Sequence, residues 1–166
     1  MAARRLGAWQ AGAVVPDVPW LGGHQLAQRV AATEWTPVDA DPRIERLWRR
    51  RDELLTRLPA VLSHGDFSAG NLIAPGSPDG ATVVLDWATL GTGPPGADLA
   101  ALALSTSTDP VEDFLTGADG RLRRADVELG YRATLALTGA GRVHWMLSRG
   151  VPLPDGYEEF VVSRAP

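Results

Sequence analysis

The stretch Ser63-His64-Gly65-Asp66-Phe67-Ser68-Ala69-Gly70-Asn71 lies between short apolar segments and determines how the whole chain is interpreted. It contains one carboxylate, Asp66, and one carboxamide, Asn71, in a loop with two glycines. After a proline- and glycine-rich turn at 75–80, a second apolar segment ends in another carboxylate, Asp86. Buried acids without partners are costly, so acids at the mouth of apolar strands indicate a functional purpose.

The apolar segments at 71–74 and 81–87 are predicted to be the two strands of a β-hairpin. If the turn centres on residues 78–79, Asn71 lies directly opposite Asp86. Directly opposed residues have Cβ atoms roughly 4.5–5.5 Å apart on the same face of a sheet. We therefore expect the carboxamide and the carboxylate to lie close enough to share one cation.

Oxygen ligands of this kind suit Mg²⁺, which takes one or two protein ligands and completes its shell with phosphates and waters. The sequence therefore predicts that Asn71 and Asp86 bind the metal. Asp66 precedes Asn71 across a loop that contains Gly65 and Gly70, and it can lie near the metal without binding it. A carboxylate in that place can orient a hydroxyl group and accept its proton.

The bulk composition is that of an ordinary globular protein. The chain has 166 residues, of which 45% are hydrophobic and 22% charged, and we expect residues 1–166 to form a single domain. It has no apolar run long enough to span a membrane, no secretory signal and no cysteine. Disulfides and thiolate chemistry are thus excluded, and a cytoplasmic location is expected.

The charge pattern argues against nucleic-acid binding. The net charge is −4, and all 16 basic residues are arginine. The arginines at 46–51 can be interpreted as a nucleic-acid patch, but the solvated face of a helix is the favoured interpretation. The absence of lysine excludes a Walker A loop or a Schiff base within this chain.

The remaining pattern predicts an α+β fold that is mainly helical, with helices before and after a small β-hairpin region. A short strand is expected at 61–64. Helices are expected at 2–12, 20–32, 41–58 and 97–104, from 109 onwards, at 126–148 and at 157–162.

The central stretch resembles a kinase catalytic loop. From His64 to Asn71 it reads H-G-D-x4-N, and Asp86-Trp87-Ala88 stands where the metal-binding D-F-G occurs. The glycine after the histidine resembles the aminoglycoside phosphotransferase and choline kinase group. In that group a glycine-rich segment ending in D-L-A follows, and the segment at 91–100 ends in these three residues. The resemblance is strong over residues 61–101.

The resemblance implies a role for five residues. Asp66 corresponds to the catalytic base, Asn71 and Asp86 to the Mg²⁺ ligands, and His64 and Asp98 to residues that brace the loop. The implied fold is the large, C-terminal lobe of the protein-kinase-like fold. The implied reaction transfers the γ-phosphate of ATP, or of another nucleoside triphosphate, to a hydroxyl group of a small molecule. The expected acceptors are aminoglycoside-like, choline-like or sugar-like alcohols, with no nucleic acid and no membrane as partner.

The small, nucleotide-binding lobe of that fold is not visible in the sequence. Nothing before residue 61 predicts a β-sheet, and the lysine that contacts the nucleotide phosphates in the family has no counterpart. The alternative hypothesis is therefore a one-lobe protein that binds a ligand or partner without phosphoryl transfer. A further possibility is that another chain supplies the missing lobe.

Three other interpretations of the same residues are weaker. The segment 91–96 matches G-x-G-x-x-G, but Pro94 and Pro95 lack the N–H groups that a dinucleotide site uses, so a structural loop is preferred. Asp66 with Asp86 could be a glycosidase pair, but the carboxamide spacing favours a metal site. Asp98 can also be a helix N-terminal acid, alone or in addition to bracing the loop.

Overall fold

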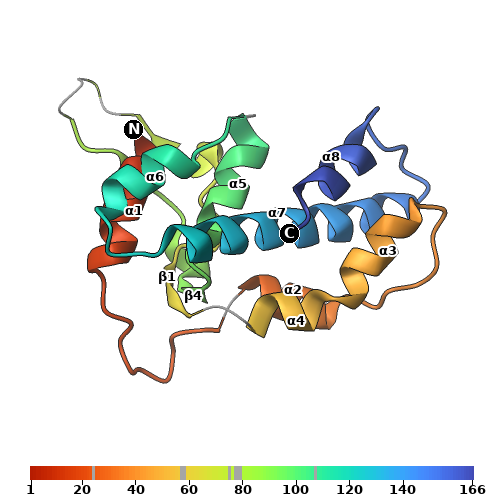
Figure 1. Cartoon of the computed structure of the whole chain (residues 1–166), viewed down its shortest axis with the longest axis horizontal. Coiled ribbons are helices and arrows are strands. Elements are labelled where there is room, and N and C mark those ends of the chain that lie inside the picture. The colour runs from red at the N-terminus through yellow and green to blue at the C-terminus, as the bar shows by residue number, and fades with distance from the viewer. Residues whose placement is uncertain (24, 57–58, 75, 77–79, 107) are drawn as a thin grey trace.

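The computed structural model describes residues 1–23, 25–56, 59–74, 76, 80–106 and 108–166 (Figure 1). Within these residues the helices are α1 (Ala2–Gly12), α2 (Gln25–Ala32), α3 (Pro42–Arg49), α4 (Arg51–Thr56), α5 (Ala97–Thr106), α6 (Val111–Ala118), α7 (Arg124–Leu147) and α8 (Tyr157–Arg164). The strands are β1 (Val61–Ser63), β2 (Leu72–Ile73), β3 (Val83–Val84) and β4 (Gly91–Gly93), with short 3₁₀ turns η1 (Ala69–Asn71) and η2 (Trp87–Thr89). The α+β, mainly helical class predicted from the sequence is confirmed.

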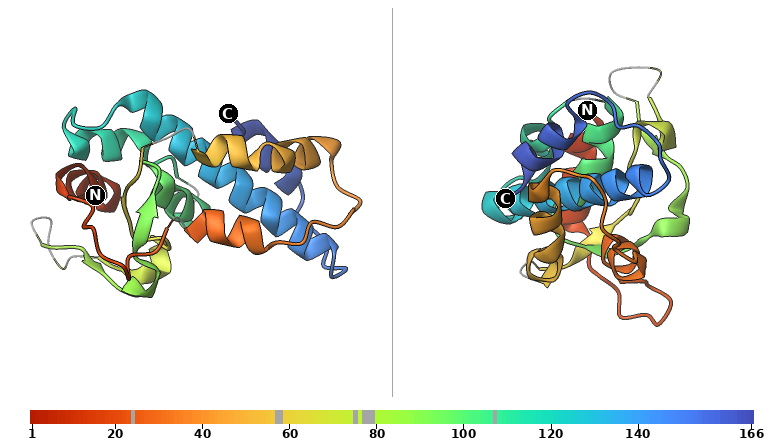
Figure 2. Two further views of the ribbon diagram at one scale, coloured as in Figure 1. Left: turned by 90° about the horizontal axis from the view of Figure 1, so that it is seen from below. Right: turned by 90° about the vertical axis from the view of Figure 1, so that its right-hand side faces the viewer.

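Helix α7 runs along the molecule and joins its two parts (Figures 1 and 2). One part contains α1, α5, α6 and the strands, and its core includes Leu99, Phe114 and Leu135. The other contains α2, α3, α4 and α8, and its core includes Ile44 and Leu137. Leu135 and Leu137 lie two residues apart on α7 and belong to different cores. This helix therefore fixes how the two parts are placed.

Helices α1 and α6 cross at a very short distance because glycine lies on each of them. A Cβ on Gly7 would overlap the backbone oxygen of Phe114, and a Cβ on Gly117 would overlap that of Arg4. This crossing holds α1 beside the strand that leads into the central loop.

Two of the predicted helices differ from the sequence-based expectation. The helix expected at 41–58 begins as predicted, with Asp41 accepting a hydrogen bond from Arg43 N–H at 2.8 Å, but it is divided into α3 and α4 at Arg50. The helix expected from Trp20 starts only at α2, because Gly22 forms a β-bridge with Gly91 and keeps the preceding segment extended.

The strands form two separate antiparallel pairs. In one, β1 pairs with β4, with Val61 opposite Gly93; in the other, β2 pairs with β3. The segment at 91–96, expected to be a structural loop, therefore begins with a strand, since β1 needs a hydrogen-bonding partner. Among the described residues, no helix combines the length and apolar character needed to cross a membrane.

Candidate functional site

The loop that follows β1 is held by the carboxylate of Asp98, in the first turn of α5. Its Oδ1 accepts hydrogen bonds from the Ser63 hydroxyl and from Gly65 N–H, each at 2.8 Å. Its Oδ2 accepts from His64 N–H at 2.8 Å and from the side-chain amide of Gln10 at 3.0 Å. The predicted loop brace thus contacts successive backbone N–H groups of the loop, an arrangement that fixes its path.

Asp98 is almost completely buried, with 3% of its surface exposed. Burial raises the pKa of its carboxyl group, and the hydrogen bonds from His64, Gly65 and Ser63 counteract part of that rise because they favour the charged form. Gly65 has φ of 83°, a left-handed conformation suited to glycine, and this orientation of its peptide lets its N–H reach the carboxylate.

His64 links the loop to the segment that carries the second acid. Its ring is fully buried, and its Nε2 lies 2.9 Å from the carbonyl oxygen of Leu85. A carbonyl only accepts, so Nε2 carries the proton and Nδ1 accepts from Asp66 N–H at 3.3 Å. The ring also meets Trp87 edge to face, and its own carbonyl accepts from the Thr89 hydroxyl at 2.5 Å. His64 is therefore positioned to support the loop and not to bind a metal.

Asp66 and Asn71 lie together. The Asn71 side-chain Nδ2 donates to the Asp66 carbonyl oxygen at 2.9 Å and to its Oδ2 at 3.1 Å. The Asp66 side chain is exposed to solvent. Because Nδ2 makes both bonds, the Asn71 Oδ1 remains available, and no described residue donates a hydrogen bond to it. A carboxylate that can accept a proton thus stands beside a free amide oxygen.

The predicted hairpin register is wrong by one residue. Leu72 pairs with Val84, and Leu85 N–H donates to the Asn71 carbonyl at 2.8 Å, so Asn71 lies opposite Leu85 and not opposite Asp86. The prediction assumed a turn with two central residues, and such a turn has an even number of residues between the strands. The observed pairing of Ile73 with Val83 leaves an odd number of residues between the strands. Most of that turn lies outside the described residues.

Asp86 directly follows Leu85 and takes up a left-handed conformation, with φ of 57° and ψ of 65°. The alternation of side chains along a strand ends at such a residue, so the register alone no longer decides which way its carboxylate points. The side chain is exposed, and no described residue forms a hydrogen bond or ion pair with it. Asp86 thus stays next to the backbone that pairs with Asn71.

The oxygen atoms of Asn71 and Asp86 suit a hard cation that completes its shell with phosphates and waters. No cluster of three or more His, Cys, Asp or Glu side chains in the described parts of the chain could hold a metal by itself. A magnesium site here would therefore depend on ligands from a bound nucleotide, as the two-ligand prediction requires.

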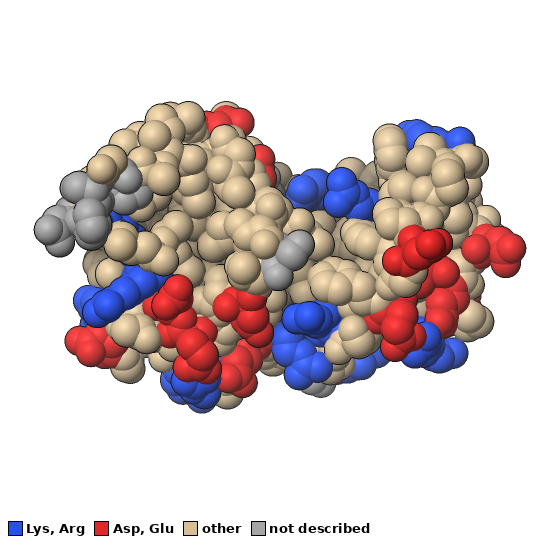
Figure 3. All heavy atoms as spheres, turned by 90° about the horizontal axis from the view of Figure 1, so that it is seen from above, with Lys and Arg blue, Asp and Glu red and all other residues tan. Residues whose placement is uncertain are grey.

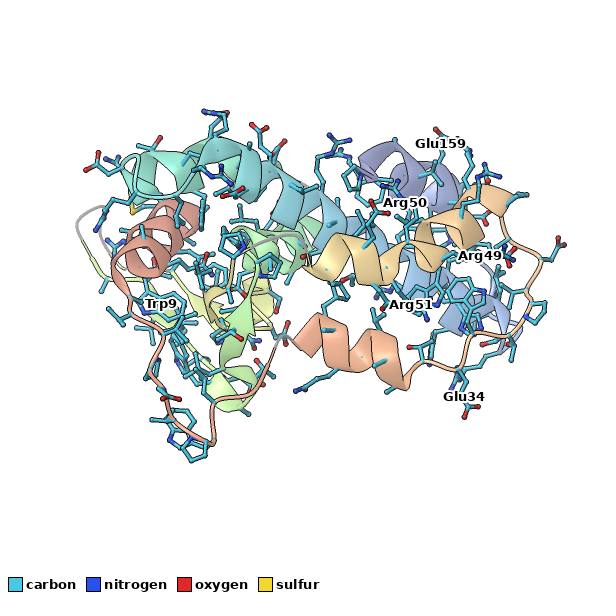
Figure 4. The ribbon with its side chains drawn as sticks, turned by 60° about the horizontal axis from the view of Figure 1, so that its bottom comes forward. Trp9, Glu34, Arg49, Arg50, Arg51 and Glu159 are labelled. Carbon is cyan, nitrogen blue, oxygen red and sulfur yellow. The ribbon has the colours of Figure 1, made fainter. Side chains whose placement is uncertain are left out.

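Aromatic side chains support the loop from behind. Trp9, which projects from α1 (Figure 4), meets Trp87 edge to face at 5.7 Å between ring centroids. Both line a cavity of about 290 Å³ together with His64 and Phe67. The sequence places Trp9 and Gln10 near one face of the first helix, but it does not show that this face lies against the loop.

A second cavity, of about 410 Å³, opens beside Asp66. Arg29 from α2 and Arg142 from α7 contribute to its wall, with Ser105 and Thr138. Neither arginine was predicted as a site residue, since nothing near them in the sequence connects them to the central loop. The cavity offers space for an acceptor molecule next to the carboxylate.

Comparisons with known proteins agree with this geometry. A family model described as the phosphotransferase enzyme family matches residues 3–135. The structure is similar to a choline/ethanolamine kinase family protein from Mesorhizobium loti, with a TM-score of 0.63 and 18% sequence identity. The match covers 98% of this chain and 59% of that chain, and at this identity it shows the fold alone. No curated protein sequence matches. The resemblance predicted from the H-G-D loop is confirmed, as is the large-lobe fold.

Proposed function

Because the chain belongs to the phosphotransferase enzyme family, we propose that it acts in the ATP- and Mg²⁺-dependent transfer of a γ-phosphate to a hydroxyl group of a small molecule. The observation that carries the proposal is the exposed Asp66 carboxylate, held by Asn71 at the edge of a cavity of about 410 Å³. A cytoplasmic location, as expected from the sequence, fits a reaction that uses ATP.

In this proposal Asp66 acts on the acceptor. Its carboxylate aligns the acceptor hydroxyl group and takes its proton. At the same time the hydroxyl oxygen forms a bond to the γ-phosphorus, and the bond from that phosphorus to the leaving ADP breaks. The Asn71 amide keeps the carboxylate in place, at 3.1 Å from Oδ2. The rigid loop matters because phosphoryl transfer depends almost wholly on positioning and electrostatics.

Asn71 and Asp86 are the residues that would hold Mg²⁺. When bound, the metal neutralises charge on the β- and γ-phosphates. The Asn71 Oδ1 and the Asp86 carboxylate have no hydrogen-bond partner among the described residues. The Asp86 carboxylate can therefore turn towards a metal without breaking an existing contact, and the Asn71 Oδ1 is free to bind one while Nδ2 stays bonded to Asp66.

A thermal-shift titration with Mg²⁺ and ATP tests binding. The parent protein should be stabilised by ATP only when Mg²⁺ is present, and Asp86→Asn should lose most of that stabilisation. Asn is tolerated in the left-handed conformation, so this variant should melt like the parent without ligand. A parent protein that shows no metal-dependent shift would count against the proposal.

A second experiment tests the base. Asp66→Ala should lower any acceptor-dependent ADP release by about 10²–10⁴-fold. The fold should change little, since the side chain is exposed. Turnover equal to that of the parent would exclude Asp66 as the base.

The alternative function is binding without phosphoryl transfer. It is favoured by the complete absence of lysine, because the family resemblance implies a lysine on the nucleotide phosphates. The chain spans 59% of the length of the choline/ethanolamine kinase family protein that it matches, so the activity of a whole protein of that family is a proposal for this chain. Acceptor binding without any Mg²⁺- and ATP-dependent shift would support this alternative.

A further inference from the structure

The cavity beside Asp66 has a larger cavity as its neighbour. The first has a volume of about 410 Å³ and the second about 500 Å³, and they share three lining residues, Arg29, Thr138 and Arg142. The two cavities thus adjoin beside α7, and together we call them the acceptor groove. It begins at the proposed base and ends against Trp48 and other apolar side chains.

Positive charge gathers where the two cavities meet. The guanidinium groups of Arg29 and Arg142 are exposed, and within the described residues neither has a hydrogen bond or ion pair to a side chain or backbone group. Figure 3 shows arginine side chains in the hollow between the two bulges of the surface. Some other surface arginines, such as Arg43 and Arg124, are paired with acids.

Negative charge in the acceptor groove is limited. Asp98 is buried and its two oxygens already accept four hydrogen bonds. Glu34 lines the far cavity but projects outwards after α2 (Figure 4). Arg149, in the same cavity, lies over the Trp145 ring at 4.9 Å. The proposed base, Asp66, is therefore the one acid in the near cavity, among the described residues, whose oxygens are not fully engaged.

The rest of the acceptor groove can accept an apolar body. Trp48 and Leu137 form part of its wall, and Trp145 has 52% of its surface exposed. In the near cavity, Thr134 is 6% exposed and its hydroxyl has no hydrogen-bond partner. The groove thus offers a polar, positive centre and an aromatic end.

We propose that the acceptor is an anionic alcohol. Its carboxylate or phosphate monoester pairs with Arg29 and Arg142, its hydroxyl group faces Asp66, and its body lies against Trp48 and Trp145. This inference rests on the proposed function and names its substrate class. Guanidinium groups recognise carboxylate and phosphate through paired hydrogen bonds.

The two arginines also solve an electrostatic problem. An anionic acceptor would be repelled by the Asp66 carboxylate in a groove without compensating charge. Arg29 and Arg142 on the wall attract an anionic acceptor and repel a cationic one. Choline-like and aminoglycoside-like acceptors, which carry positive charge, are therefore disfavoured relative to acidic sugars and hydroxy acids.

Calorimetric titration with probes of one size and different charge tests this. The anions are 3-phenyllactate, a carboxylate, and 2-phenylethyl phosphate; the neutral probe is 3-phenylpropane-1,2-diol; the cation is phenylalaninol. The parent protein should bind an anion at least about tenfold more tightly than the neutral probe and the cation. The two anions, compared with each other, show whether carboxylate or phosphate is preferred.

Matched variants locate the effect. Arg29→Gln and Arg142→Gln should each weaken anion binding by about fivefold to tenfold and leave the neutral probe unchanged. The control is Arg46→Gln, an exposed arginine on α3 that lines neither cavity, and it should bind like the parent. Circular dichroism and melting should be unchanged in all three variants.

Two results would overturn the inference. One is equal binding, or no binding, of anion and cation by the parent. The other is loss of Mg²⁺–ATP affinity in the arginine variants while 3-phenyllactate binds as before, which would assign the arginines to the nucleotide. Because the probes are titrated without nucleotide, anion binding that depends on Arg29 and Arg142 would remain a positive result even if the Asp86→Asn titration disproved the kinase activity.

Discussion

Replacement of Asp98 by asparagine tests how the central loop is held. The substitution Asp98→Asn keeps the size of the side chain and one acceptor oxygen, but it places an NH₂ group where an oxygen now accepts two hydrogen bonds. The least costly arrangement puts that group near the Ser63 hydroxyl, which can rotate to accept. Gly65 N–H, now bonded at 2.8 Å, then loses its partner.

The expected cost follows from the bonds that change. One unpaired buried N–H costs about 1–3 kcal/mol. The remaining hydrogen bonds, which the new amide group would donate to Ser63 and accept from His64 and Gln10, no longer involve a charged group, and this adds roughly 0.5–1 kcal/mol for each. Removal of a buried charge whose pKa is raised by burial returns about 1–2 kcal/mol. The net destabilisation is therefore centred on about 3 kcal/mol, or roughly 6–12 °C in melting temperature.

Urea and thermal unfolding near pH 8 measure this cost. Asp17→Asn is the matched control, because Asp17 is exposed and no described residue pairs with it; it should change stability by less than about 0.5 kcal/mol. If Asp98→Asn unfolds within that same range, the carboxylate does not hold the loop and the reasoning fails. A large loss of Mg²⁺–ATP binding with unchanged stability would point instead to a direct role in the site.

Two further predictions concern backbone geometry. Gly117→Ala should destabilise the fold by at least about 2 kcal/mol in urea unfolding, because the added Cβ overlaps the Arg4 backbone. The control Gly23→Ala should cost far less, because a Cβ on Gly23 meets open space. Equal effects of the two variants would exclude the close helix crossing as the cause. Asp86→Ala should lose about 1 kcal/mol relative to Asp86→Asn, and Asp86→Gly should be at least as stable as the parent, because the left-handed conformation disfavours a Cβ. Equal stability of the three Asp86 variants would show that this conformation carries no cost.

The sequence was most informative where the chemistry is local. The base and the carboxamide are five residues apart, and their side chains meet as the loop length allows. The hairpin was predicted, but its register was not, because a register follows from turn length and a one-residue slip places each residue opposite a different partner. The pairing of β1 with β4 was also missed, since Gly91–Gly93 offers no apolar alternation to mark a strand.

The parts that could not be predicted depend on contacts between distant segments. Gln10 reaches Asp98 from α1, and Arg29 and Arg142 meet at the acceptor groove from α2 and α7. A glutamine on an otherwise apolar helix face was the one available signal for the first contact. For the arginines there was none, because an exposed arginine on a helix is ordinary until the packing of α2 on α7 is known.

The observed hairpin register explains how Asp86 is placed. A carboxylate on a regular strand opposite Asn71 would need no special conformation. The structure instead fixes Leu85 twice, by its N–H to Asn71 and by its carbonyl to His64, and then turns the chain into a left-handed residue. A non-glycine residue in that conformation costs free energy. Glycine would avoid that cost but has no side-chain oxygen, and we therefore propose that the carboxylate at this position binds a ligand.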